Sequence, residues 1–153
     1  MFSAILALAL VVGPPWISIE YPANPLDPTT RGGYLLVHSF HHQAAVQAQI
    51  AGEAVTWENG QRRAIPLRFE STSRPGVYKL AKQWTDGVPY VLVITAGEGE
   101  HGSATALVSV TAAGLVAKVE VPSEPYRDFR VPRAPSAGEI AAAFRAAGGQ
   151  PQG

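Results

Sequence analysis

The 153-residue sequence contains no cysteine. This absence excludes structural disulfides, thiolate zinc sites and thiol nucleophiles together. Charged residues are also few, at 16%, and twelve basic residues balance twelve acidic ones. Because a general nucleic-acid-binding protein needs a net basic surface, this balance argues against nucleic acid as a partner. The length corresponds to one domain, and its hydrophobic core is large enough for the chain to fold without disulfides or bound metals.

The familiar catalytic and nucleotide-binding motifs are absent as well. The sequence has no GxSxG nucleophile elbow, no Walker-type phosphate loop and no GxGxxG turn. The glycine-rich stretch at residues 96–103 carries Glu98 and Glu100, but it lacks the ligand periodicity of a calcium loop. We therefore expect a protein that is not an enzyme and that needs no cofactor.

No apolar run reaches the ~20 residues that a membrane-spanning helix needs. Residues 2–12 (FSAILALALVV) form a shorter run, which ends at Gly13-Pro14-Pro15. The run is typical of a signal-peptide core, with Ala7-Leu8-Ala9 as a candidate cleavage site, although no basic residue precedes it. We expect residues 1–15 to be an export signal or a retained membrane-surface anchor, which predicts a periplasmic or extracellular location. A buried first strand or helix is the alternative.

Short apolar or alternating stretches, separated by turn residues, fill the sequence between residues 16 and 122. They come without helical periodicity, which favours an antiparallel sandwich or barrel of the all-β class. Asn59-Gly60 is the strongest signal for a hairpin turn. We expect strands at residues 16–21, 33–40, 46–50, 65–69, 77–84, 90–95, 104–110 and 115–121.

Residues 86–95 (DGVPYVLVIT) have the pattern of a central strand. Apolar residues fall on both of its faces, so we expect it to lie inside a sheet that is covered on each side. Asp86 and Tyr90 also have the spacing of a tyrosine corner, in which a phenol near the start of a strand bonds to upstream backbone. Trp57 and Trp84 are the candidates for buried core tryptophans.

Residues 76–121 resemble immunoglobulin-like domains of bacterial extracytoplasmic proteins. The resemblance lies in the segment GVYKL at residues 76–80, in Trp84, in Asp86-Gly87, in the strand that begins at Tyr90 and in a closing hairpin. It implies an immunoglobulin-like antiparallel β-sandwich of about seven to eight strands. Leu92 stands where an antibody-type domain has its second cysteine. Because such sandwiches serve many functions, the resemblance implies a fold rather than a role.

Histidines form the most conspicuous cluster of metal-ligating residue types. His38, His41 and His42 lie close together, and His101 lies in the glycine-rich stretch. Imidazoles at a strand end and in the next loop can converge on copper or zinc. The spacing differs from HExxH, and no carboxylate lies close in sequence. The alternative is that these are polar residues where a strand passes into a loop.

The composition changes after Pro122. Residues 123–135 are rich in proline and arginine and are expected to be extended. Ser136 and Glu139 have the spacing of a capping box, ahead of an expected helix at residues 137–147. A helix of this length is marginal alone, so it must dock on the domain or on a partner.

Arginine and aromatic residues are enriched at protein interfaces, so this C-terminal segment is the candidate partner-binding region. A linker lying along the sandwich is the alternative. The candidate partner-binding residues are Tyr126, Arg127, Phe129, Arg130, Arg133, Ile140 and Phe144.

The sequence therefore predicts an apolar segment at residues 1–15, a β-sandwich domain at residues 16–122 and an extension at residues 123–153. The first functional hypothesis is a non-enzymatic extracytoplasmic binding or structural domain. It would be an accessory subunit of a membrane-associated assembly, with a protein partner. The second hypothesis is a domain that handles copper or zinc through its histidines.

Overall fold

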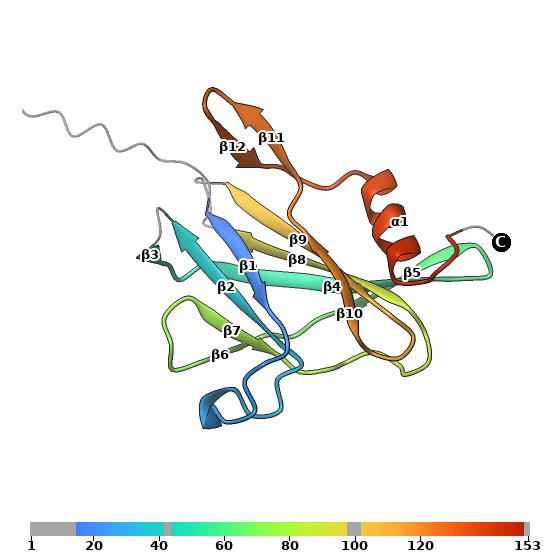
Figure 1. Ribbon diagram of the computed structural model, residues 1–153, viewed down its shortest axis with the longest axis horizontal. Helices are drawn as coiled ribbons and strands as arrows, with labels where there is room; N and C mark the ends of the chain where they lie inside the picture. Colours follow the sequence, from blue (N-terminus) through green and yellow to red (C-terminus); the bar gives the residue numbers. More distant parts are fainter. Residues whose placement is uncertain (1–14, 42–43, 98–101, 152–153) are drawn as a thin grey trace, which may run out of the picture.

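The computed structural model describes residues 15–41, 44–97 and 102–151. In these residues antiparallel strands form two five-stranded sheets, and a separate two-stranded hairpin and an α-helix follow them (Figure 1). The predicted all-β class is therefore confirmed, with one short helix near the C-terminus.

The first sheet has the order β1-β2-β7-β6, and β3 pairs with β2 at its end. Its strands are β1 (Trp16–Glu20), β2 (Leu35–His41), β3 (Ala44–Ala45), β6 (Glu70–Ser71) and β7 (Val77–Leu80). A short 3-10 helix, η1 (Pro28–Thr30), lies in the connection between β1 and β2.

The second sheet has the order β10-β9-β8-β4-β5. Its strands are β4 (Gln49–Glu58), β5 (Gln61–Pro66), β8 (Tyr90–Gly97), β9 (Ser103–Val110) and β10 (Val116–Glu120). The chain then forms the hairpin strands β11 (Ser123–Tyr126) and β12 (Phe129–Pro132) and ends in α1 (Ala137–Ala146).

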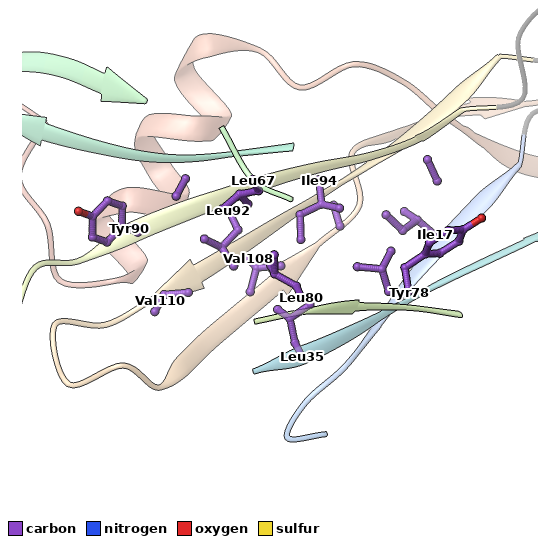
Figure 2. Packing of buried hydrophobic residues seen from close by; sticks show 14 of the residues in the cluster. Ile17, Leu35, Leu67, Tyr78, Leu80, Tyr90, Leu92, Ile94, Val108 and Val110 are labelled. Atoms are coloured by element: carbon purple, nitrogen blue, oxygen red, sulfur yellow. The ribbon is translucent and has the colours of Figure 1, made fainter. Parts of the chain in front are cut away.

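The inner faces of the two sheets share one hydrophobic core, part of which Figure 2 shows. Alternate residues of each strand point into it, as the two-residue period of a strand requires. The first sheet contributes Ile17, Leu35, Val37, Tyr78 and Leu80, and the second contributes Ala54, Tyr90, Leu92, Ile94, Val108 and Val110.

Strand β8 lies in the middle of the second sheet, between β9 and β4. Leu92 and Ile94 on its inner face and Val91 on its outer face are fully buried. Helix α1 packs on the outer face, where Ala143 and Phe144 join Val91 in a second, smaller core. The expected central strand with both faces covered is therefore present.

Asn59 and Gly60 form the turn between β4 and β5, both with positive φ (51° and 75°). This is the geometry of a two-residue type I′ hairpin turn, as expected from the dipeptide. The strand boundaries differ from the expectation, because β4 is one long strand and β5 ends at Pro66. Leu67 and Phe69 pack against the core from outside a strand.

Strand β10 differs from the expected alternation. Its pairing with β9 shifts between Val116 and Lys118, which marks a bulge. A bulge inserts one residue and changes which side chains face inward. Val116 and Val119 therefore lie on the inner-face side, opposite Val110 and Val108, and Leu115 precedes the strand. Leu115 is 60% exposed, and Val119 on this edge strand is 41% exposed.

The ring of Tyr90 is buried, with 3% of the residue exposed. In the described part of the chain its hydroxyl has no hydrogen bond partner, and Figure 2 shows the oxygen pointing away from the other labelled residues. The hydrogen bond of a tyrosine corner is therefore not present there. Asp86 is exposed in the preceding turn and pairs with Lys82.

Two other tyrosines make the long-range bonds to backbone. Tyr78 donates its hydroxyl proton to the carbonyl oxygen of Ala48, at 2.7 Å. Tyr34 donates to the carbonyl oxygen of Gly114, at 2.9 Å. The Tyr78 bond runs to upstream backbone, as was expected of Tyr90, and the Tyr34 bond runs to backbone downstream.

The two candidate core tryptophans have different places. Trp84 lies in the main core, 5.0 Å from the ring of Tyr34 and 6.3 Å from that of Tyr90. Trp57 lies on the outer face of the second sheet and packs against Phe144 of α1. Trp84 is thus the tryptophan of the main core.

Candidate functional site

The N-terminus of α1 carries the expected capping box. The Ser136 hydroxyl accepts a hydrogen bond from the Glu139 amide, and the Glu139 carboxylate accepts one from the Ser136 amide. Arg133 donates two further hydrogen bonds to the same carboxylate, at 2.6 and 2.8 Å. Arg133, with help from the Ser136 amide, lowers the pKa of Glu139 to about 2.

The apolar face of α1 is used within the domain. Phe144 is 2% exposed, and its ring centroid lies 4.6 Å from that of Trp57. Ile140 packs against the same outer cluster, which includes Val91 and Leu107. Both residues therefore contact their own sheet. Phe144 is buried and is not available to a partner, whereas Ile140 is partly exposed.

Residues 123–132, expected to be an extended segment, form the β11–β12 hairpin instead. Four residue pairs join its strands, from Ser123 opposite Pro132 to Tyr126 opposite Phe129. The amide of Arg133 donates to the carbonyl oxygen of Pro122 at 3.0 Å and closes its base. Figure 1 shows the hairpin projecting beyond both sheets.

The tip of the hairpin, residues 126–129, is where exposed aromatic side chains gather. Tyr126 and Phe129 are 50% and 51% exposed, and their ring centroids lie 5.4 Å apart in an edge-to-face arrangement. The Arg127 guanidinium lies 5.4 Å from the centre of the Tyr126 ring. Arg127 has a φ of 52°, a left-handed conformation that non-glycine residues adopt rarely.

Arg130 lies on β12 next to the tip, and Arg133 follows β12 at the base of the hairpin. Both make contacts within the chain. Arg130 donates to the hydroxyl and carbonyl oxygens of Ser123, at 2.9 and 2.6 Å. Arg133 is held by Glu139. The partner-binding candidates that remain available at the tip are therefore Tyr126, Arg127 and Phe129. Ser123 accepts both hydrogen bonds from Arg130. No sequence pattern pointed to this role, because only the pairing of β11 with β12 brings the two residues together.

The structure separates the two histidines that it describes. Nε2 of His38 lies 2.7 Å from a carboxylate oxygen of Glu20 on β1. His41 lies three positions further along β2, and a separation of three places two side chains on opposite faces of a strand. No group of three or more histidine, aspartate or glutamate side chains in the described ranges could hold a metal ion. His42 and His101 lie outside the described residues.

Among the described residues there is no helix with the length and apolar character needed to cross a membrane. No family model, no curated protein and no solved structure matches the chain. The exposed aromatic residues of the hairpin tip are therefore the candidate contact surface in the described part of the chain.

Proposed function

We propose that this chain is a non-enzymatic extracytoplasmic binding domain that acts as an accessory subunit of a membrane-associated protein assembly. We further propose that it contacts its protein partner through the hairpin tip. The observation that carries this proposal is the pair of half-exposed aromatic rings of Tyr126 and Phe129 on a projecting two-stranded hairpin.

Three physical arguments support the tip as a contact surface. An isolated two-stranded hairpin is at best marginally stable in water, so a covering partner stabilises it. Tyrosine and arginine are enriched among the residues that dominate binding energy at protein interfaces. Tyrosine buries a large area with few torsions to fix, and the planar guanidinium of arginine loses little freedom per hydrogen bond formed. The φ of 52° at Arg127 is what a two-residue hairpin turn needs, and this turn holds the paired residues Tyr126 and Phe129 together at the end of the hairpin before any partner binds.

We also propose that the two sheets form an immunoglobulin-like sandwich. The order β1-β2-β7-β6 corresponds to strands A-B-E-D of that fold, and β5-β4-β8-β9 corresponds to C′-C-F-G. In this scheme β10 is an additional strand beside G. The scheme supports a role as a rigid scaffold that presents loops and hairpins at its ends, as these sandwiches do.

An extracytoplasmic location is supported by the apolar stretch at residues 2–12 and by the absence of cysteine, which is compatible with export. Sequencing the N-terminus of mature protein from the native host tests this part. A start beyond Ala9 indicates cleavage, and a start at Met1 with membrane association indicates a retained anchor. A start at Met1 in a soluble cytoplasmic fraction would contradict the proposed location.

Photo-crosslinking tests the tip directly. A photoreactive residue at position 126 or 129, in the full chain expressed in the native host, should give a discrete crosslinked product in solubilised membranes. Positions 26 and 115 are matched controls, because Leu26 and Leu115 are also exposed apolar residues (88% and 60%) but lie outside the hairpin. Products of equal yield from the control positions would argue against a specific tip.

Substitution provides the second test. Replacing both Tyr126 and Phe129 by serine should abolish the association and leave the melting temperature nearly unchanged, because both side chains are half exposed. Leu26→Ser together with Leu115→Ser should leave the association intact. If the tip variant still associates and the triple alanine variant of His38, His41 and His42 loses the association together with copper or zinc, the metal hypothesis replaces this one.

A further inference from the structure

A cleft of about 370 Å³ lies between β10, the hairpin and α1. Val121, Ala142 and a small exposed part of Leu107 (1% of the residue) contribute apolar lining. The charged residues that line it are Lys118, Glu120, Arg130, Arg133 and Glu139. A cavity of this size with a few polar groups fits a side chain or a small organic molecule.

Two of the three cations in the cleft are neutralised by carboxylates. Arg133 pairs with Glu139 at 2.6 Å. Lys118 pairs with Glu120 at 2.8 Å. Arg130 has no carboxylate partner in the part of the chain that the structure describes. The cleft therefore carries one uncompensated positive charge, located on Arg130.

Arg130 is also held in a defined orientation. Its Nε and one Nη2 proton bind the two oxygens of Ser123, which occupies one side of the guanidinium fork. An arginine has five N–H donors, so the end formed by the two terminal nitrogens still offers donors to a ligand. That end has the geometry that binds a planar carboxylate through two parallel hydrogen bonds.

We propose that the cleft binds a monocarboxylate with a small apolar body, with the carboxylate on Arg130 and the apolar part near Val121 and Ala142. The chain terminus of a peptide and a free short-chain acid share this chemistry. Because Lys118 and Arg133 are already paired with carboxylates, the cleft offers one free positive charge. The second charge of a phosphate dianion has no partner there, so phosphate binds more weakly.

This site is distinct from the hairpin tip. Arg130 pairs with Pro125 in the hairpin register, whereas Tyr126 pairs with Phe129. Adjacent positions on a strand point to opposite faces, so Arg130 and Phe129 lie on opposite faces of the hairpin. Binding at the cleft therefore does not depend on the proposed function of the tip.

NMR titration of the full chain tests the proposal. The probes are hexanoate, hexanamide, inorganic phosphate, and N-acetyl-Ala-Leu with either a free or an amidated terminus. At least one of the two acids should give saturable shifts at Arg130, Val121 and Ala142. The matching amide should give none, and phosphate should bind more weakly. The peptide acid binding more tightly identifies a chain terminus as the source, and hexanoate binding more tightly identifies a free acid.

Variants locate the binding. Arg130→Gln should weaken the acid by at least about tenfold, since a hydrogen bond to a charged group is worth that much. Arg130→Lys keeps the charge but loses the two parallel donors of the guanidinium, so it should also weaken binding. It is the test variant if Arg130→Gln destabilises the hairpin. Arg127→Gln is the matched control and should have no effect, as should the double serine variant of Tyr126 and Phe129.

Several results would overturn the proposal. These are the absence of saturable binding by both acids, equal binding of acid and amide, tighter binding of phosphate, or unchanged affinity in both Arg130 variants.

Discussion

The rings of Trp57 and Phe144 pack against each other, with centroids 4.6 Å apart and an angle of 39° between the ring planes. This contact joins β4, near the middle of the chain, to the helix at its end. It makes α1 part of the domain, because the helix covers Val91 and Leu107 on the outer face of the second sheet. Deleting residues 123–153 would expose that face, so deletion cannot separate partner binding from folding.

Gly149 tests the docking of α1. A Cβ at this position would overlap the ring of Phe144. Gly149→Ala should therefore destabilise the protein by about 1–3 kcal/mol, because the packed ring has to move. Gly138→Ala is the matched control, since its Cβ would meet no atom closer than 3.9 Å. That change should stabilise the helix by roughly 0.5–1 kcal/mol. Urea denaturation measures both, and equal effects of the two would contradict the docking.

Tyr78 and Tyr90 provide a second matched pair. Tyr78→Phe removes the hydroxyl that donates to the Ala48 carbonyl oxygen and lies 2.7 Å from the Gln47 side-chain amide, and should cost about 1–3 kcal/mol of stability. Tyr90→Phe should change stability by less than about 0.5 kcal/mol, because its hydroxyl has no such bond in the described part of the chain. Thermal melting of both variants measures the two losses of stability. A larger loss for Tyr90→Phe would indicate that the Tyr90 hydroxyl makes the hydrogen bond of a tyrosine corner.

Ser136→Ala removes the N-cap of α1. The Glu139 amide loses its acceptor, and the helix should lose about 1 kcal/mol of stability. Hydrogen exchange should show lower protection for the α1 amides, while the amides of β8 stay protected because they belong to the main sheet. Equal loss of protection in both elements would mean that the helix does not open separately.

The Arg133–Glu139 pair predicts a pH dependence. Arg133 lowers the pKa of Glu139 from an ordinary 4.5 to about 2. A lowered pKa in the folded state stabilises the protein at pH values above 4.5, and this contribution is lost as the pH falls toward 2. Stability curves of the wild type and Glu139→Gln should therefore converge on acidification. A constant difference between pH 7 and pH 2.5 would contradict the assignment.

Local sequence signals predicted several elements correctly, because neighbouring residues decide them. The Asn59-Gly60 turn and the Ser136 capping box each depend on a few adjacent residues. The alternation in residues 90–95 placed Leu92 and Val91 on opposite faces, both of which are covered, since strand geometry alone sets the two faces. The aromatic and arginine content of residues 126–129 likewise pointed to the candidate surface.

Only the tertiary structure decided which distant groups meet. Phe144 packs on Trp57 rather than on a partner, and the hydroxyl of Tyr78 rather than that of Tyr90 reaches a backbone carbonyl. The proline-rich segment pairs with itself as a hairpin, which leaves Tyr126 uncovered. These outcomes depend on contacts between residues far apart in the chain, whose geometry is set only when the sheets pack and not by any local pattern.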